Sequence, residues 1–345
     1  MTDIHIRIEG KVGWITLSRP QALNALTYAM CLEIDATLKT WAQDDRVALL
    51  LIDAEGDRAF SSGGDIAQMY ATGTKGDFAY GQRFWADEYR MNARLFEFPK
   101  PVVTFLQGFT MGGGVGVGCH GSHRIVDDTA QIAMPECGIG LIPDVGGSLI
   151  LARAPGRLGE YLGTTGHRMG PADAIYAGFA DYYIAQEHWP DLKAALLGSG
   201  DVSVVDEAAQ TRPDSLLAAQ QALIDQFFAG ETLRDIVNAL SGDDGELAAR
   251  ALKAITRNAP LSVASAVELI HRVRSTPDNI RHALGLEYRF TARAMEKGDF
   301  LEGIRAAIID KDRSPNWQHA RPKDVTPAEV SAMLMPLGDA ALTFD

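Results

Sequence analysis

The chain has 345 residues, 46% of them apolar and 22% charged, and its formal net charge is −13. This length suits one large domain with an appendage or two domains, and the negative charge disfavours a nucleic acid as partner because the overall field would repel a polyanion. Three cysteines, a start without a basic segment and an apolar stretch, and the lack of a run of about 18 apolar residues lead us to expect a cytoplasmic protein with no disulfide framework and no membrane span.

The first part of the chain alternates between short apolar strands and amphipathic helices. Apolar runs bounded by turns are typical of buried strands, and apolar residues three or four apart are typical of helices. In chain order the sequence predicts a hairpin over 4–17, a helix over 30–44, a strand from 47, a helix from 80 that ends before Pro99, a strand over 101–107, a glycine-rich turn with a helix, and strands over 123–128 and 130–136. This order indicates an α/β fold.

The composition changes near residues 195–215, which are rich in Gly, Ser, Asp and Pro and indicate a boundary. Beyond it the apolar spacing is helical over 214–228, 246–258, 262–274 and 280–296. We therefore expect a core over residues 1–200 that holds the active site, followed by a helical region over 201–345 that packs on the core.

Two glycine-rich segments, 57–69 and 106–121, share one arrangement: a strand, a turn, glycines and a helix. Small residues let another atom approach the backbone, and the amides at a helix N-terminus carry the positive end of the dipole. Two such turns side by side would aim two amides at one carbonyl oxygen, as in an oxyanion hole. The alternative is that the glycines only permit tight turns.

Two other motifs carry little weight. Residues 116–121 match G-x-G-x-x-G, but the preceding strand ends about eight residues too early and the spacing to Asp127 or Asp128 is too short, so we expect no dinucleotide site. Cys119, His120 and His123 lack a second ligand pair at zinc-like spacing, so we expect no metal site.

Residues 133–147, AMPECGIGLIPDVGG, hold two acids, Glu136 and Asp144, in mostly apolar surroundings. Pro143 prevents one helix from carrying both. Asp144 could simply cap the helix that follows, and Glu136 could be a buried, paired carboxylate. The functional interpretation is that the two acids titrate apart. One would then attack a carbonyl or deprotonate water, and the other would protonate a leaving group.

These segments resemble the crotonase, or enoyl-CoA hydratase/isomerase, superfamily. The resemblance rests on four motifs in order, at 17–27, 58–66, 108–118 and 133–147. Residues 88–92 and 299–317 extend it and make the chain most similar to the 3-hydroxyisobutyryl-CoA hydrolase group. The resemblance implies a core of repeated β-β-α turns in a spiral, followed by the helical C-terminal region.

The resemblance also implies the site residues. It assigns catalysis to Glu136 and Asp144, the oxyanion-hole amides to Ser62 and Gly113, and substrate contact to Glu88. The neighbouring residues predicted to bind substrate are Gly63, Gly64, Asp65 and Gly112. On helix propensity alone, Glu88 could instead be a surface residue.

Two departures bear on the reaction that the resemblance implies. Hydratases that resemble this chain have a glutamate where Gly116 stands, and usually a glycine where Asp144 stands. We therefore expect hydrolysis of a short-chain 3-hydroxyacyl-CoA thioester, with 3-hydroxyisobutyryl-CoA of valine catabolism as the implied substrate. The alternatives are an enoyl-CoA hydratase or isomerase, or a CoA-binding protein that has lost its chemistry. CoA is part of the substrate, so no separate cofactor is expected; nucleic acid and membrane are not expected as partners, and a homo-oligomer is left open.

Overall fold

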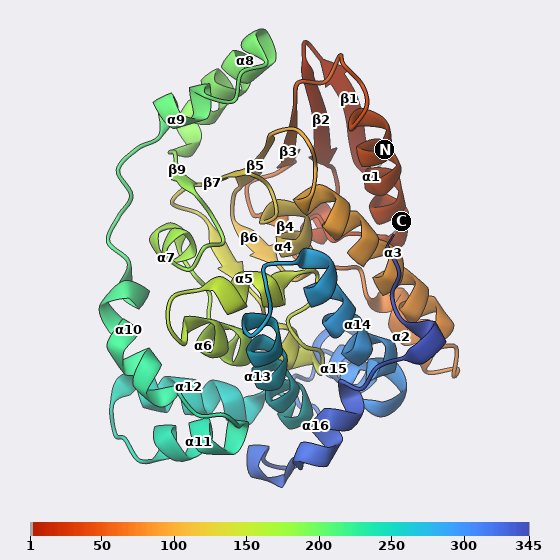
Figure 1. Cartoon of the computed structure of the whole chain (residues 1–345), viewed down its shortest axis with the longest axis vertical. Coiled ribbons are helices and arrows are strands. Elements are labelled where there is room, and N and C mark those ends of the chain that lie inside the picture. Colours follow the sequence, from red (N-terminus) through yellow and green to blue (C-terminus); the bar gives the residue numbers. More distant parts are fainter. Residues whose placement is uncertain (1–2, 345) are drawn as a thin grey trace. The chain divides into compact units, whose positions relative to one another are not determined.

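The computed structural model describes residues 3–344. Contacts between residues divide the chain into two compact units whose segments alternate along the sequence (Figure 1). The first unit comprises residues up to Asp65, Arg90–Ala133 and Arg168–Ala218, and the second comprises Ile66–Tyr89, Met134–His167 and the residues from Ala219 on. The sequence boundary between the two units falls inside two helices, α3 (Ala79–Phe96) and α10 (Leu216–Phe227).

Within residues 3–344, the strands of the first unit form two sheets. The larger has the order β1-β2-β3-β5-β7-β9 and the smaller has the order β4-β6-β8. Only β1 and β2 pair antiparallel, as the predicted hairpin; the other pairs are parallel. The strands are β1 (Ile4–Glu9), β2 (Val12–Leu17), β3 (Leu49–Ala54), β4 (Ala59–Ser61), β5 (Val102–Leu106), β6 (Phe109–Met111), β7 (His123–Val126), β8 (Gln131–Ala133) and β9 (Tyr182–Tyr183).

Successive strands alternate between the two sheets. Strands β3, β5 and β7 join the larger sheet, and the strand after each joins the smaller one before a helix follows. This is the repeated strand–strand–helix turn that the resemblance implies. Strands β4 and β6 have three residues each and were not predicted.

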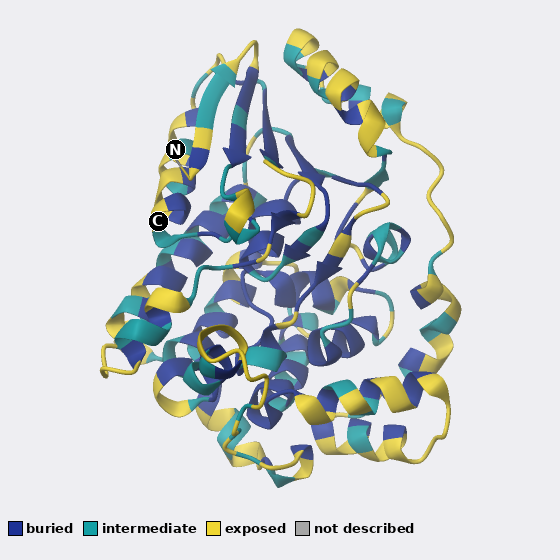
Figure 2. Ribbon diagram, turned by 180° about the vertical axis from the view of Figure 1, so that it is seen from behind, coloured by how far each residue is buried: buried dark blue, intermediate teal, exposed yellow. Residues whose placement is uncertain are grey.

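Both faces of the larger sheet are covered, which is why its central strands are continuously apolar (Figure 2). On one face, Trp189 and Leu196 of α8 belong to a single core cluster with Leu49 and Phe105. On the other, a side chain on Gly13 would overlap the ring of Trp41, so α1 packs closely there. The other helices and turns of this unit are η1 (Pro20–Ala22), α1 (Tyr28–Trp41), α4 (Gly113–Gly118), α7 (Pro171–Tyr176), η3 (Gln186–His188), α8 (Trp189–Ser199) and α9 (Val204–Ala208).

The second unit is helical, and the predicted C-terminal helices are confirmed. Its centre is α13 (Pro260–Arg274), which contacts α5, α6, α11, α12, α14 and α16. Its other elements are α2 (Ala67–Gly73), η2 (Glu136–Ile139), α5 (Gly147–Arg153), α6 (Leu158–Thr165), α11 (Leu233–Ser241), α12 (Glu246–Arg257), α14 (Ile280–Lys297), α15 (Phe300–Ile304), the π-helical turn η4 (Arg305–Ile309), η5 (Pro322–Asp324), α16 (Pro327–Met333) and η6 (Gly338–Ala340).

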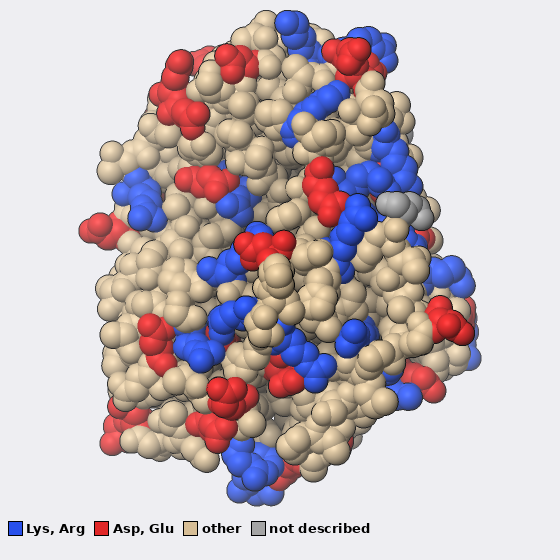
Figure 3. Space-filling view, viewed as in Figure 1, with Lys and Arg blue, Asp and Glu red and all other residues tan. Residues whose placement is uncertain are grey.

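Acidic and basic side chains are interspersed over the face drawn in Figure 3. Among the residues that the structure describes, no helix is both long enough and apolar enough to cross a membrane.

A buried ion network joins two helices of the second unit. Glu160 of α6 is fully buried and accepts hydrogen bonds from Arg157 (2.9 Å), His271 (3.0 Å) and Arg274 (2.8 Å to Oε2). Burial opposes ionisation of Glu160, but the hydrogen bonds from Arg274 and His271 outweigh it and lower its pKa to about 2.

We expect Glu160→Gln to lower the free energy of unfolding by about 2 kcal/mol at pH 7, because it removes the buried charge that pairs with the partly buried side chains of Arg157 and Arg274. A folded-state pKa of about 2, below the ordinary 4.5, means that the wild type loses this stability as the pH falls from about 4.5 to about 2. Urea denaturation at pH 7 and pH 3 measures both effects. Equal unfolding midpoints for variant and wild type at pH 7 would contradict the prediction.

Candidate active site

The two acids singled out in the sequence lie in the second unit, on the loop from β8 to α5. The prediction that Glu136 closes the strand is wrong, because β8 ends at Ala133. Glu136 is instead the first residue of the 3-10 turn η2. Glu136 is 4% exposed, and neither of its carboxyl oxygens has a hydrogen-bond partner among residues 3–344. The interpretation of Glu136 as a paired carboxylate is therefore wrong.

Asp144 is also buried, and its carboxylate is held by α3. The Tyr89 hydroxyl donates a hydrogen bond to Oδ2 of Asp144 at 2.7 Å. The N-cap of α5 is Gly146, so Asp144 does not cap that helix with its side chain. The alternative that Asp144 is only a cap is wrong.

Glu88 precedes Tyr89 on α3 and is 3% exposed, so it is not a surface residue. Its Oε1 is buried and has no hydrogen-bond partner in the described part of the chain. A fourth acid, Glu287 of α14, is fully buried beside this group and was not singled out in the sequence.

These acids shift one another's titration. Burial, and then the charge of Asp144, raise the pKa values of Glu136 and Glu88 well above their ordinary range. Burial also raises the pKa of Asp144 to about 7 and that of Glu287 to about 8. The Tyr89 hydrogen bond keeps the pKa of Asp144 from rising further.

The order of ionisation follows from these contacts. Asp144 has a donor and loses its proton near neutral pH, whereas Glu136 has no donor and keeps its proton. Near neutral pH the two acids therefore hold about one proton between them, and they titrate as a coupled pair. This is a suitable arrangement for acid–base chemistry, because both a carboxylate and a carboxylic acid are available.

The two glycine-rich segments meet in the first unit, as predicted. Gly63 has φ +110°, and a Cβ atom there would lie 3.1 Å from the Met111 carbonyl oxygen and 3.7 Å from the Gly113 amide nitrogen. A Cβ atom on Gly114 would lie 2.6 Å from the Ser61 carbonyl oxygen. Only glycine allows the segments to approach this closely.

The predicted pair of amide donors needs one correction. The Ser62 amide already donates to the Leu23 carbonyl oxygen at 2.9 Å, so it is not available to a ligand. Gly64 pairs with Leu26 in a parallel β-bridge. The hydrogen bonds of this bridge join Leu26 to the Gly63 carbonyl oxygen and to the Asp65 amide, so the Gly64 amide takes no part in it. Within residues 3–344 the amides of Gly64 and Gly113 donate to no other residue. The geometry therefore favours Gly64 over Ser62.

Other predicted positions have defined surroundings. The carboxylate of Asp65 accepts from Arg19 at 3.1 Å and forms an ion pair with it. Gly112 is the N-cap of α4 with φ 50°. The carbonyl oxygen of Gly116 accepts from the side-chain amide of Asn92 at 3.0 Å, and this glycine is buried in α4.

The cysteine and histidines of the second glycine-rich segment make structural contacts. Cys119 is buried, His120 meets the ring of Phe96 edge-on, and His123 stacks on Tyr182. Among the described residues, no three His, Cys, Asp or Glu side chains are grouped so that they could hold a metal ion.

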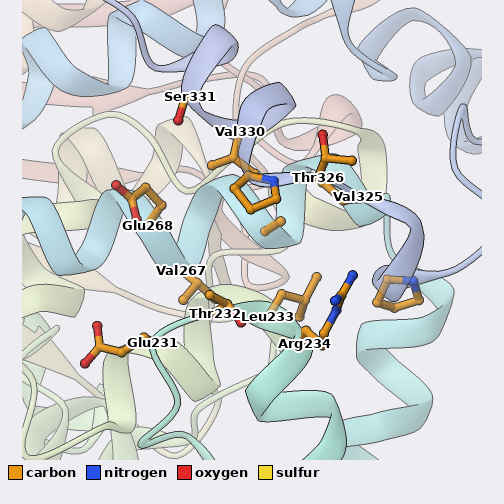
Figure 4. Close-up of a pocket in the computed structure, with 13 residues that line it drawn as sticks. Glu231, Thr232, Leu233, Arg234, Val267, Glu268, Val325, Thr326, Val330 and Ser331 are labelled. Carbon is orange, nitrogen blue, oxygen red and sulfur yellow. The ribbon is translucent and has the colours of Figure 1, made fainter.

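A separate cavity of about 250 Å³ lies in the second unit between α11, α13 and α16 (Figure 4). Its lining includes Glu231, Arg234 and Glu268, and none of the predicted site residues. Thr232 and Thr326 line it too, but each hydroxyl is used in the capping box of its own helix. This cavity is therefore not the candidate active site.

Comparisons with known proteins identify the family and the fold. A family model described as "Enoyl-CoA hydratase/isomerase" matches residues 12–334. The chain is 35% identical to mitochondrial 3-hydroxyisobutyryl-CoA hydrolase of Mus musculus over 99% of this chain and 91% of that protein. Its fold is similar to crystal structures of an enoyl-CoA hydratase from Rhodobacter sphaeroides 2.4.1 (TM-score 0.96, 57% identity, 99% of this chain and 100% of that one) and a carnitinyl-CoA dehydratase from Mycobacterium thermoresistibile (TM-score 0.95, 39% identity, 100% and 99%).

We expect Gly114→Ala to lower the free energy of unfolding by about 2 kcal/mol, because the new methyl group would overlap the Ser61 carbonyl oxygen. Gly198→Ala is the matched control: it also places alanine in a helix, but no atom lies within 4 Å of the new Cβ. The control should be neutral or stabilising by up to about 1 kcal/mol. Chemical denaturation measures both, and equal stabilities would contradict the close approach.

Proposed function

Because the chain belongs to the enoyl-CoA hydratase/isomerase family and has the crotonase fold, we propose that it hydrolyses a short-chain 3-hydroxyacyl-CoA thioester to the free acid and CoA. We propose 3-hydroxyisobutyryl-CoA, an intermediate of valine catabolism, as the substrate. The observation that carries the proposal is the coupled pair of buried acids, Glu136 and Asp144, with Gly116 where a second hydratase acid would stand. The similarity to 3-hydroxyisobutyryl-CoA hydrolases supports it.

In the proposed reaction, the amides of Gly64 and Gly113 stabilise the negative charge that develops on the thioester oxygen. Glu136 attacks the carbonyl carbon to give a mixed anhydride that water then hydrolyses, or it removes a proton from the attacking water. Either route breaks the carbon–sulfur bond and leaves a thiolate that needs a proton. The cluster can supply both the base and the proton.

Asp144 suits the role of proton donor to the thiolate. A pKa of about 7 means that both of its forms are populated at neutral pH, so it can give a proton and recover it. Glu136 becomes a reactive carboxylate when the single proton of the pair passes from it to Asp144, which then carries the proton that the thiolate needs. Glu88, which burial keeps protonated, can donate a hydrogen bond to the substrate.

Hydration of an enoyl-CoA is the second candidate function. It is favoured by the 57% identity to the structure of an enoyl-CoA hydratase. Addition of water across a double bond by two glutamates would lack one partner here, because position 116 is glycine. Release of free CoA distinguishes the two reactions, since hydration leaves the thioester intact.

The test is a panel of short acyl-CoA thioesters assayed with a thiol reagent. We expect CoA release from 3-hydroxyacyl-CoA substrates, and a fall in kcat on the order of 10²–10⁴-fold in Glu136→Gln, because this change removes the charge but keeps the size. Glu33→Gln, on the exposed face of α1, is the control and should keep the wild-type rate. Hydrolysis by Glu136→Gln at the wild-type rate would reject the assignment.

The pH dependence of kcat/KM should be bell-shaped, with the active form carrying one proton on the pair. Because the pKa of Asp144 is raised to about 7, the rate should fall as the pH drops below about 7, where the pair becomes neutral. Tyr89→Phe removes the hydrogen bond that favours ionised Asp144, so its acid limb should move to higher pH.

Tyr183→Phe provides the matched control for that shift. Tyr183 also donates to an aspartate, Asp128, at 2.7 Å, but this pair is exposed. The acid limb of Tyr183→Phe should coincide with that of the wild type. An acid limb near pH 4 in the wild type would show that no buried carboxyl controls the reaction.

A further inference from the structure

The turn that carries Asp144 is closed by a local hydrogen bond, from the Gly147 amide to the Asp144 carbonyl oxygen at 2.7 Å, but its backbone conformation is unfavourable for the residues in it. Val145 is buried and β-branched, yet its φ is 54°, a left-handed conformation that such residues rarely adopt. Gly146 follows with φ 79° and is the N-cap of α5. A glycine has no side chain to cap the helix, and no local side chain does so. The conformation must therefore be stabilised from elsewhere.

Glu287 of α14 supplies the missing cap. Its Oε2 accepts from the Gly146 amide at 2.9 Å, and its Oε1 accepts from the Ser148 amide at 3.2 Å. The hydroxyl of Ser148 also makes a short hydrogen bond to Oε1. A side chain about 140 residues away in sequence thus satisfies the free amides of the turn.

The same helix also supports the side chain of Asp144. Thr291 lies one turn after Glu287 on α14, and its hydroxyl is 3.4 Å from the hydroxyl of Tyr89, which donates to Asp144. The ring of Tyr288 meets that of Tyr89 edge-on, with centroids 6.3 Å apart. Helix α14 therefore holds the turn that follows Asp144 through Glu287, and it contacts Tyr89, which binds the Asp144 carboxylate.

Glu287 is held by hydrogen bonds and not by a counter-cation. Glu287 is fully buried, and no ion pair joins it to a basic side chain within residues 3–344. The titratable groups that interact with it also ionise to anions: Asp144, Glu136 and Tyr89. An apolar side chain of similar volume would avoid the cost of burying another carboxyl, but it would leave the amides of Gly146 and Ser148 without their acceptor.

We propose that Glu287 is a positioning residue for Asp144, assisted by Thr291, so that the C-terminal helix α14 is part of the active site. This inference rests on the proposed function, in which Asp144 is catalytic. Glu287 acts by fixing the turn at Val145 and Gly146, and it does not touch the substrate.

Glu287→Ala should lower kcat by about 10²-fold, the order expected when a catalytic group is misplaced by about 1 Å, and should leave KM within about threefold of wild type. Its acid limb should move to higher pH, as in Tyr89→Phe, because the relaxed turn withdraws Asp144 from the tyrosine hydroxyl. Glu287→Gln keeps an acceptor for the turn and should lose less activity. A folded Glu287→Ala variant with wild-type kcat and acid limb would overturn the proposal.

Two control variants separate positioning from folding. Glu160→Gln changes another fully buried glutamate of the same unit and should reduce stability while kcat stays unchanged. Thr291→Val should lower kcat, whereas Thr164→Val, at a buried helical threonine bonded only within its own helix, should not. If Glu287→Ala does not fold, Glu287→Gln and Thr291→Val test whether α14 positions Asp144. The proposal is overturned if both variants have the kcat and the acid limb of the wild type.

The experiment also distinguishes failure of this inference from failure of the proposed function. If the wild type releases CoA from no thioester in the panel, the proposed function fails, and the crystal structures of the variants provide the readout. In Glu287→Ala, the hydrogen bond between Tyr89 and Asp144, 2.7 Å in the wild type, should then be lost. If that bond persists at the same length, Glu287 does not position Asp144.

Discussion

The burial of several carboxyl groups without a counter-cation is the constraint on which the rest of this site depends. Glu88, Glu136, Asp144 and Glu287 are all buried, and burial is the first cause of each raised pKa. Folding therefore stabilises the protonated forms of these acids, and their ionisation above neutral pH opposes folding. A cluster of this kind persists only if the surrounding helices supply the compensating packing and hydrogen bonds.

The same unit shows that the chain can neutralise a buried acid. Glu160 is as deeply buried as Glu287, but two arginines and a histidine donate to it, and its pKa is about 2. The two glutamates therefore affect stability in opposite directions as pH changes: Glu160 stabilises the fold when ionised, and Glu287 when protonated. The lack of a hydrogen-bond partner for the Glu136 carboxyl among residues 3–344 is thus local to this cluster, where burial raises the pKa of Glu136 well above its ordinary range.

Periodicity and turn residues predicted most of the secondary structure, because these signals are local. The hairpin, α1, the parallel strands and the C-terminal helices lie close to their predicted ranges. Strands β4 and β6 were not predicted, because three residues are too few to show an alternation of apolar and polar side chains. These strands form by pairing with segments that are distant in sequence. The Ser62 amide was misassigned for a related reason: its partner, Leu23, comes from a loop whose placement no local pattern reveals.

The acid at position 287 could have been noticed, but its role could not. It interrupts the apolar face of a predicted helix, in the stretch ALGLEYRF, which is an unusual place for a charge. Its partners, Gly146 and Ser148, are about 140 residues earlier and are backbone groups, which leave no chemical signature in a sequence.

The left-handed turn at Val145 explains why such a distant partner is needed. A turn that local residues favoured would settle into a relaxed geometry, whereas a strained one keeps its direction only while tertiary contacts hold it. By placing Asp144 on a strained turn and capping that turn from α14, the fold makes the orientation of one carboxylate depend on the assembly of the C-terminal helices.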